Sequence, residues 1–184
     1  MNLRLALLSH GAPKSVKMRL LDELARATSA GFDCERPSWT GRSYEARLEE
    51  YARFTADQAG RVLETGNADA VEAVKRRLRS ESADLGARMR RGLRLTRCAD
   101  VMDALSALYG HIGIDMRPLT AGDIVVGRCL FARYFTEPVC MVVAAIDQGM
   151  AAGLSGGGRL EFVERITGGA PCCRARFDLV RWAR

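Results

Sequence analysis

Apolar residues recur at helical spacing along the first half of the chain. In residues 16–30 they fall three or four positions apart, as at Met18, Leu21 and Leu24. Gly31 follows this segment, and glycine is a common residue just past the end of a helix. The same spacing predicts three more helices, over residues 44–63, 68–93 and 99–109.

After residue 111 the pattern changes to short alternating segments around one apolar helix. Strands are predicted over residues 115–119, 123–128, 160–166 and 173–180, and the helix over residues 138–154. The last two strands are expected to pair as an antiparallel hairpin. Helices and strands are partly segregated along the chain, which favours an α+β fold over a doubly wound sheet. We expect one domain over residues 1–184, with a helical part (1–94) and an α+β core that carries the site (95–184).

The predicted helix over residues 138–154 carries two residues that could do chemistry. Cys140 and Asp147 are seven apart, or about two turns, and therefore share one face. Cys140 lies near the N-terminus of the helix, where a lowered thiol pKa is expected to favour a nucleophilic thiolate. The alternative is a small buried hydrophobe. Asp147 interrupts an apolar run, so it is either an acid, base or amine anchor, or an ordinary hydrogen-bond acceptor.

The two C-terminal strands supply two further candidates. Strict alternation places Glu164 on the same side as Leu160 and Phe162, which is the side expected to be buried. The alternative for Glu164 is a surface ion pair with an arginine on the next strand. Cys173 lies on the apolar side of the last strand, where it is either a site thiol or a core residue.

An aromatic loop follows the strand over residues 123–128. Cys129 begins this loop and Tyr134 lies within it, and both are candidates for binding substrate because strand ends often line sites. With Cys140, Asp147, Glu164 and Cys173 as catalytic candidates, we expect one shared cavity. Buried thiols and carboxylates are costly unless they are paired or used.

Composition restricts the classes of protein that fit. The chain has 184 residues, of which 48% are hydrophobic, so it can bury a core of one ordinary domain. No apolar run free of charge reaches the length of a membrane span, and residues 1–8 are too short for an export signal. Six cysteines without a CxxC pair indicate reduced thiols rather than a disulfide framework. We expect a cytoplasmic protein without a membrane partner.

The net charge of +6 comes largely from a basic segment over residues 75–97. Such a segment is either a nucleic-acid footprint or the solvated face of a long helix. Acidic residues are interleaved with it and few aromatic residues accompany it, which disfavours nucleic acid as a partner. We therefore expect a small molecule instead.

Three segments together resemble a known family. They are the strand and cysteine–aromatic loop of residues 124–131, the segment from Cys140 to Leu154, and the hairpin with Gly168-Gly169-Ala170-Pro171-Cys172-Cys173. Over about residues 95–180 the chain resembles the L-2-amino-thiazoline-4-carboxylate hydrolase family. That family is similar to the 4-vinyl reductase domain, in the ligand-binding fold shared with transport-particle subunits.

The resemblance implies hydrolytic opening of a small sulfur-containing heterocyclic amino acid. Cys140 and Asp147 match the family's cysteine–aspartate pair, and Cys173 matches the cysteine of its final strand. Some 4-vinyl reductase-like domains bind zinc through cysteines and a glutamate, and Cys140, Glu164 and Cys173 occupy similar places. A further cysteine expected just after the glutamate is absent, since Ile166 and Thr167 stand there. The sequence therefore commits to no metal and identifies no cofactor.

Two hypotheses follow. The first is a hydrolase that acts on a C–N or C–S bond of a small heterocyclic amino acid or a similar substrate. The second is a non-catalytic ligand-binding or sensor domain that uses the same pocket. A homodimer is compatible with either.

Overall fold

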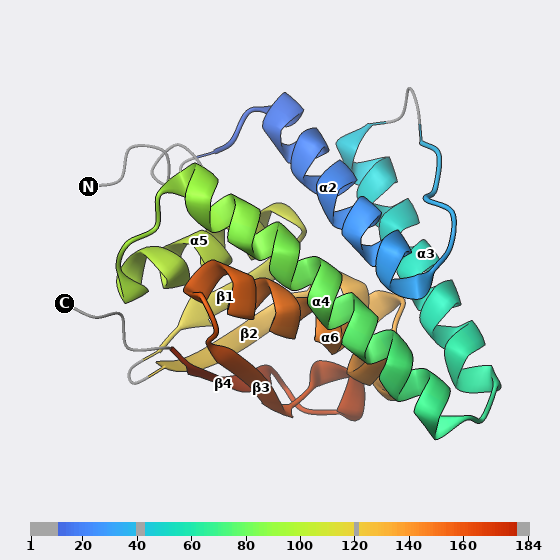
Figure 1. The fold of residues 1–184 in the computed structure, drawn as a ribbon. Helices are drawn as coiled ribbons and strands as arrows, with labels where there is room; N and C mark the ends of the chain where they lie inside the picture. Colours follow the sequence, from blue (N-terminus) through green and yellow to red (C-terminus); the bar gives the residue numbers. More distant parts are fainter. Residues whose placement is uncertain (1–10, 40–42, 120–121, 180–184) are drawn as a thin grey trace.

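The computed structural model describes residues 11–39, 43–119 and 122–179, and helices and strands are mixed along them (Figure 1). The α-helices among these residues are α2 (Lys14–Phe32), α3 (Tyr44–Glu64), α4 (Ala68–Leu93), α5 (Cys98–His111) and α6 (Glu137–Ser155). The strands are β1 (Ile114–Pro118), β2 (Asp123–Cys129), β3 (Arg159–Glu164) and β4 (Cys173–Asp178). Short 3-10 helices, η2 (Leu130–Arg133) and η3 (Ile166–Gly168), follow β2 and β3. The predicted α+β class is confirmed.

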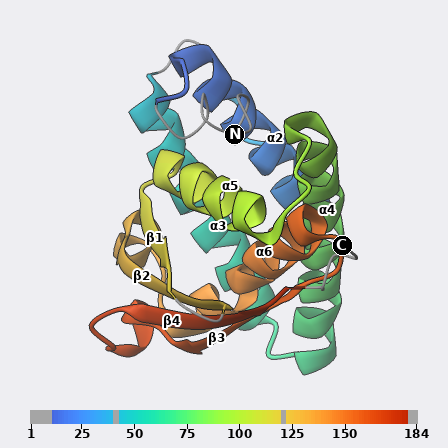
Figure 2. The same ribbon diagram turned by 90° about the vertical axis from the view of Figure 1, so that its left-hand side faces the viewer.

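The four strands form one antiparallel sheet in the order β1-β2-β4-β3. The β3–β4 hairpin forms as predicted, with Leu160 opposite Phe177. Pairing of β2 with β4 then joins the β1–β2 pair to the β3–β4 hairpin. One face carries buried apolar side chains, namely Ile124, Val126, Leu160, Ala175 and Phe177. The helices lie on that side of the sheet (Figure 2).

Helix α6 is the central helix, and it packs most closely against α4. Gly149 and Gly153 lie four residues apart on α6, so they share a face. A Cβ atom at Gly153 would lie 2.1 Å from the carbonyl oxygen of Ala83, and one at Gly149 would lie 2.2 Å from that of Arg79. The two helix backbones are therefore in direct contact, which only glycine at these positions permits.

By length and composition, α6 is also the one helix in the described part of the chain that could cross a membrane. However, 61% of its apolar window is buried inside the protein. It contacts α3, α4, α5 and β3, as a core helix does. Its apolar character is explained by this central position, and the signal for a membrane span is weak.

Two differences from the predicted elements matter for the site. Strand β3 ends at Glu164, two residues earlier than expected, because the pairing with β4 shifts register between Phe162 and Glu164. Ile166 then begins η3 instead of continuing the strand. The N-terminal residues 1–8 and residues 120–121 of the predicted turn lie outside the described residues.

Candidate functional site

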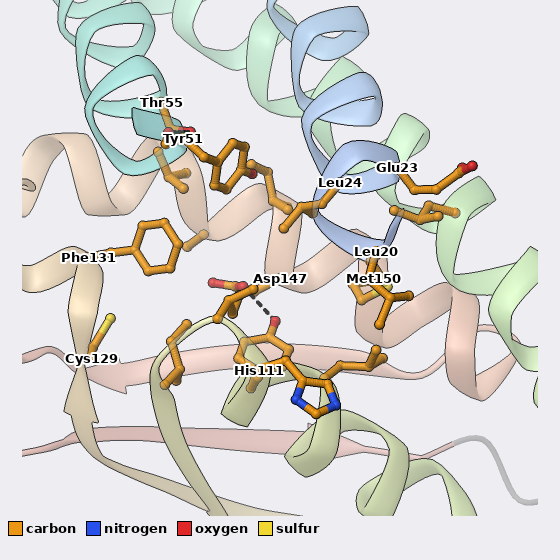
Figure 3. Close-up of a pocket in the computed structure, with 18 of the residues that line it drawn as sticks. Leu20, Glu23, Leu24, Tyr51, Thr55, His111, Cys129, Phe131, Asp147 and Met150 are labelled. Atoms are coloured by element: carbon orange, nitrogen blue, oxygen red, sulfur yellow. Dashed lines mark hydrogen bonds between the residues drawn. The ribbon is translucent and has the colours of Figure 1, made fainter. Parts of the chain in front are cut away.

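A cavity of about 490 Å³ lies between the helices and the buried face of the sheet. Cys129, Cys140, Asp147 and Cys173 all line it, although they come from β2, α6 and β4. Figure 3 shows Asp147 near the middle of the lining, with Cys129 on one side and Glu23 on the other. The fold thus brings four of the six candidate residues to one space of ligand size.

Asp147 is the most perturbed acid of the site. It keeps some accessible surface because it faces the cavity, but protein surrounds it on every side. Burial raises the pKa of its carboxyl group to about 6, since the charged form loses hydration. A hydrogen bond from Tyr109 and the nearby Arg165 partly offset this rise. Asp147 can therefore exchange a proton near neutral pH.

Tyr109 on α5 fixes the orientation of this carboxyl group. Its hydroxyl donates a hydrogen bond to Oδ1 of Asp147 over 2.5 Å, and its side chain is otherwise buried. Burial, followed by the charge of Asp147, raises the pKa of Tyr109 well above its ordinary value. Tyr109 therefore stays protonated and acts as a permanent donor.

A second buried tyrosine borders the same space. The Tyr51 hydroxyl is 2.7 Å from Oγ1 of Thr28, and the Tyr51 ring meets Phe131 edge to face at 6.0 Å. Burial and the charge of Asp147 raise the pKa of Tyr51, against the effect of its hydroxyl partners. These contacts hold the Tyr51 ring in place between Thr28 and Phe131.

The expected low pKa of Cys140 is wrong. Burial raises the pKa of its thiol, and the negative charge of Asp147 adds to that effect. The helix begins at Glu137, and the amide of Cys140 already donates to the carbonyl of Thr136. Cys140 is thus beyond the free amides of the first turn, so the helix terminus does little for its thiolate.

The other two thiols of the cavity are also held in the neutral form. Burial raises the pKa of Cys129 to about 12, with smaller contributions from Asp147 and Cys173. Burial is also the main cause of the raised pKa of Cys173, whose sulfur accepts a hydrogen bond from the Ile166 amide over 3.3 Å. The charge of Asp147 adds to the raised pKa of each of the three thiols, so all three are close to this carboxyl group.

Glu164 does not join these residues, and its expected burial is wrong. The register shift between Phe162 and Glu164 interrupts strict alternation, so Glu164 turns to the solvent-facing side of the sheet. There it forms an ion pair of 3.2 Å with Arg174 on β4. This is the cross-strand partner that the sequence offered as the alternative.

The zinc ligands implied by the resemblance are not assembled. Cys140 and Cys173 line the cavity, but Glu164 lies on the other face of the sheet. Within the described residues, no group of three or more His, Cys, Asp or Glu side chains is arranged to hold a metal ion. We derive no step through a metal.

Tyr134 is not among the residues that line the cavity. It follows η2, and the guanidinium carbon of Arg53 lies 5.4 Å from its ring centroid. The aromatic loop still contributes to the site, through Phe131 and Phe135. The prediction named the wrong aromatic residue of this loop, because the 3-10 helix η2 sets which of its side chains face the cavity.

A buried hydroxyl group lies near the thiols. Oγ1 of Thr167 is buried without a hydrogen-bond partner in good geometry. The hydroxyl is close enough to Cys140 to lower the pKa of its thiol, against the effect of burial. Thr167 lines the cavity, so this oxygen is available to a ligand.

Sequence reasoning missed the residues on helices α2 and α5. Tyr109 is at the end of an amphipathic helix and looks like a core aromatic. On α2, Arg19 and Glu23 line the cavity together with Arg88 of α4. These charges lie on helices far from Asp147 in sequence, and only the packing of the helices brings them to one space.

A scan of protein families finds no family model that matches the chain, and no curated protein sequence matches it. The resemblance to the thiazoline carboxylate hydrolases and to 4-vinyl reductase-like domains therefore remains a prediction. The function has to be argued from the site.

Proposed function

We propose that the protein is an enzyme that hydrolyses a C–N or C–S bond of a small cyclic substrate held in the cavity. The observation that supports this most is Asp147, a buried carboxyl group with a pKa of about 6, hydrogen-bonded to Tyr109 in a cavity of ligand size. A carboxyl group tuned to this range is suited to general acid–base catalysis near neutral pH. The 4-vinyl reductase-like fold is part of the same proposal.

In this mechanism Asp147 starts as a carboxylate. It accepts a proton from a water molecule while that water attacks the ring carbon of an amidine or thioimidate. Asp147 then passes this proton to the former imine nitrogen, and in a second transfer it carries the proton of the new hydroxyl group to the ring nitrogen or sulfur that departs as the C–N or C–S bond breaks. The ring carbon becomes a carbonyl carbon, the ring opens, and one water molecule is consumed.

Cys140 has a smaller role in this proposal than in the sequence-based one. A nucleophilic thiol needs a thiolate, and the raised pKa keeps Cys140 protonated. We assign Cys140 and Cys173 to substrate positioning, together with the free hydroxyl of Thr167. Cys140→Ser should then retain most of the turnover, whereas a nucleophile replaced in this way would not.

The test offers the purified protein 2-amino-thiazoline-4-carboxylate and related cyclic amidine and thioimidate amino acids. Asp147→Asn should lower kcat by about two orders of magnitude or more, because the proton acceptor is lost. Asp57→Asn makes the same chemical change at an exposed ion pair with Arg61 and should leave kcat unchanged. Near-full activity in Asp147→Asn would contradict the mechanism.

The second candidate is a non-catalytic ligand-binding domain. It is supported by the raised pKa values of all three cavity thiols and by the predominantly apolar lining. Saturable binding of a panel compound without turnover would favour this function. The two candidates therefore separate in one experiment.

Nucleic acid remains a disfavoured partner, because two arginines of the basic segment serve packing. Arg77 donates to the carbonyl of Gly31 on α2, and Arg79 donates to Gln148 on α6. A small-molecule substrate, a cytoplasmic location and a homodimer remain proposals.

A further inference from the structure

Three charged residues of the cavity lining come from helices α2 and α4. Arg19 and Glu23 of α2 and Arg88 of α4 all line the cavity. Arg19 is exposed and the Arg88 side chain is 52% exposed, so the cavity reaches the surface between these two helices. We call these three residues the arginine rim. In Figure 3, Glu23 lies on the side of Asp147 opposite to Cys129.

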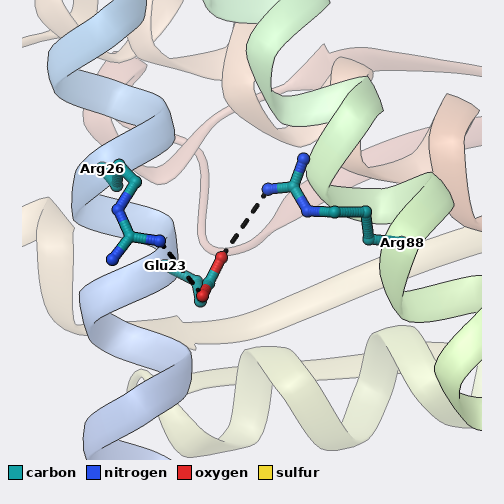
Figure 4. A network of polar contacts seen from close by, with 3 residues as sticks. All are labelled: Glu23, Arg26 and Arg88. Atoms are coloured by element: carbon teal, nitrogen blue, oxygen red, sulfur yellow. Dashed lines mark hydrogen bonds and ion pairs between the residues drawn. The ribbon is translucent and has the colours of Figure 1, made fainter.

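The guanidinium groups of the arginine rim are largely uncommitted. Glu23 is 3.6 Å from Arg88 and 3.2 Å from Arg26, so only the Arg26 contact is a hydrogen bond (Figure 4). Among the described residues, Arg88 has no other polar partner, and Arg19 has none. Arginine N–H groups in this state can bind a carboxylate in bidentate geometry.

The charges at this end of the cavity favour an anion. The three rim residues carry a net charge of +1, which matches a monoanion. Asp147 is largely ionised above its pKa of about 6 and would repel an anion at the middle of the cavity. A ligand with one carboxylate would therefore hold that group at the rim.

Much of the cavity lining is apolar. The apolar residues include Leu20, Leu24, Leu85, Met89, Leu108 and Ile112. A cyclic amino acid of about nine non-hydrogen atoms, at roughly 20 Å³ each, would fill well under half of the 490 Å³. The remaining volume suits an apolar body attached to the carboxylate.

We propose that the cavity takes an amphipathic monocarboxylate, with its carboxylate on Arg19 and Arg88 and its apolar body directed toward Asp147. This inference rests on the proposed use of the cavity for a small ligand. It deepens that function by naming a larger and more apolar substrate class than a cysteine-sized ring.

The test measures binding of three acids by calorimetry at low salt: benzoate, naphthalene-2-carboxylate and 4-phenylbenzoate. Each is compared with its own neutral carboxamide, which has the same shape. The wild type should bind at least one of the larger acids about tenfold more tightly than its amide, as a charge-assisted contact at a half-exposed rim gives. Arg19→Gln and Arg88→Gln should each reduce this preference severalfold.

Two further variants make the result specific. Glu23→Gln removes the carboxylate that competes for Arg88, so it should strengthen binding of the acids. If Glu23 instead anchored an amine of the ligand, this variant would not strengthen binding. Arg61→Gln is the matched control, since Arg61 is an exposed arginine in an ion pair on α3, away from the cavity lining. It should leave the preference unchanged.

Failure of every acid to bind the wild type better than its amide would overturn the inference, as would an equal loss in Arg61→Gln. Asp147→Asn separates this result from the proposed catalysis, because it removes turnover but should keep the carboxylate preference. A preserved preference in a protein that shows no turnover would support the ligand class and count against the hydrolase.

Discussion

The two faces of helix α6 differ in how closely they are packed. One face meets α4 through Gly149 and Gly153, where the backbones touch and no side chain intervenes. The other face presents Cys140 and Asp147 to a cavity of about 490 Å³. One helix thus carries the tightest packing described above and a ligand-sized space.

This difference shows how the protein can keep a carboxyl group on α6 that lowers the stability of the fold when it is ionised. A carboxyl group with a raised pKa costs stability wherever it is ionised, so its helix must be held by contacts elsewhere. The glycine face supplies these contacts along the length of α4.

Gly153→Ala tests the packed face. Its new Cβ atom would lie 2.1 Å from the Ala83 carbonyl oxygen and 2.7 Å from the Ala87 amide nitrogen, so a backbone must move. We expect a loss of at least about 3 kcal/mol in the free energy of unfolding, measured by urea denaturation.

Gly60→Ala in α3 is the matched control. A Cβ atom there meets nothing within 4 Å, so the variant should gain up to about 1 kcal/mol from its better helix propensity. Equal effects of the two substitutions would contradict the account of close packing.

Asp147→Asn tests the cavity face through pH. The pKa of Asp147 rises from 3.8 to about 6 on folding, so the folded state favours the protonated form. Its contribution to stability is full below about pH 4 and is lost as pH rises through 6, by about 3 kcal/mol in all. Asp147→Asn lacks this loss, so its stability relative to the wild type should rise between pH 4 and pH 8. A difference that is the same at both pH values would refute the assignment.

The sequence predicts the helices and strands well because apolar residues recur along them at regular spacing. The predicted helix over residues 68–93 has the same bounds in the structure. The predicted helix around Asp147 is correct within one residue at each end. Cys140 and Asp147 share a face because helical geometry alone requires it. The predicted burial of Glu164 was wrong because one bulge reverses the side of the sheet on which a strand residue lies. Tyr109 and the arginine rim depend on helix packing, which local periodicity does not contain.

The thiols of the cavity face should be poorly reactive near neutral pH. Burial, together with the charge of Asp147, raises the pKa of Cys140, so iodoacetamide labelling of this residue should increase only at a higher pH than for free cysteine in the same solution. Peptide mapping by mass spectrometry gives the pH dependence, which is independent of slow access to a buried thiol. A midpoint below that of free cysteine would restore Cys140 as a nucleophile.

The smallest effect is expected at Glu164, outside both faces of α6. The Glu164 and Arg174 side chains are 49% and 60% exposed, and exposed pairs are screened by solvent. Glu164→Gln should therefore change the free energy of unfolding by less than about 0.5 kcal/mol.

Because the bulge in β3 places Glu164 away from the cavity, the same variant should also keep its turnover and its ligand binding. Arg174→Gln should behave alike, since Arg174 is the ion-pair partner of Glu164 across the hairpin. A large loss of turnover in Glu164→Gln with a normal Arg174→Gln would mean that Glu164 acts in the cavity, and the strict alternation of the original sequence prediction would then hold.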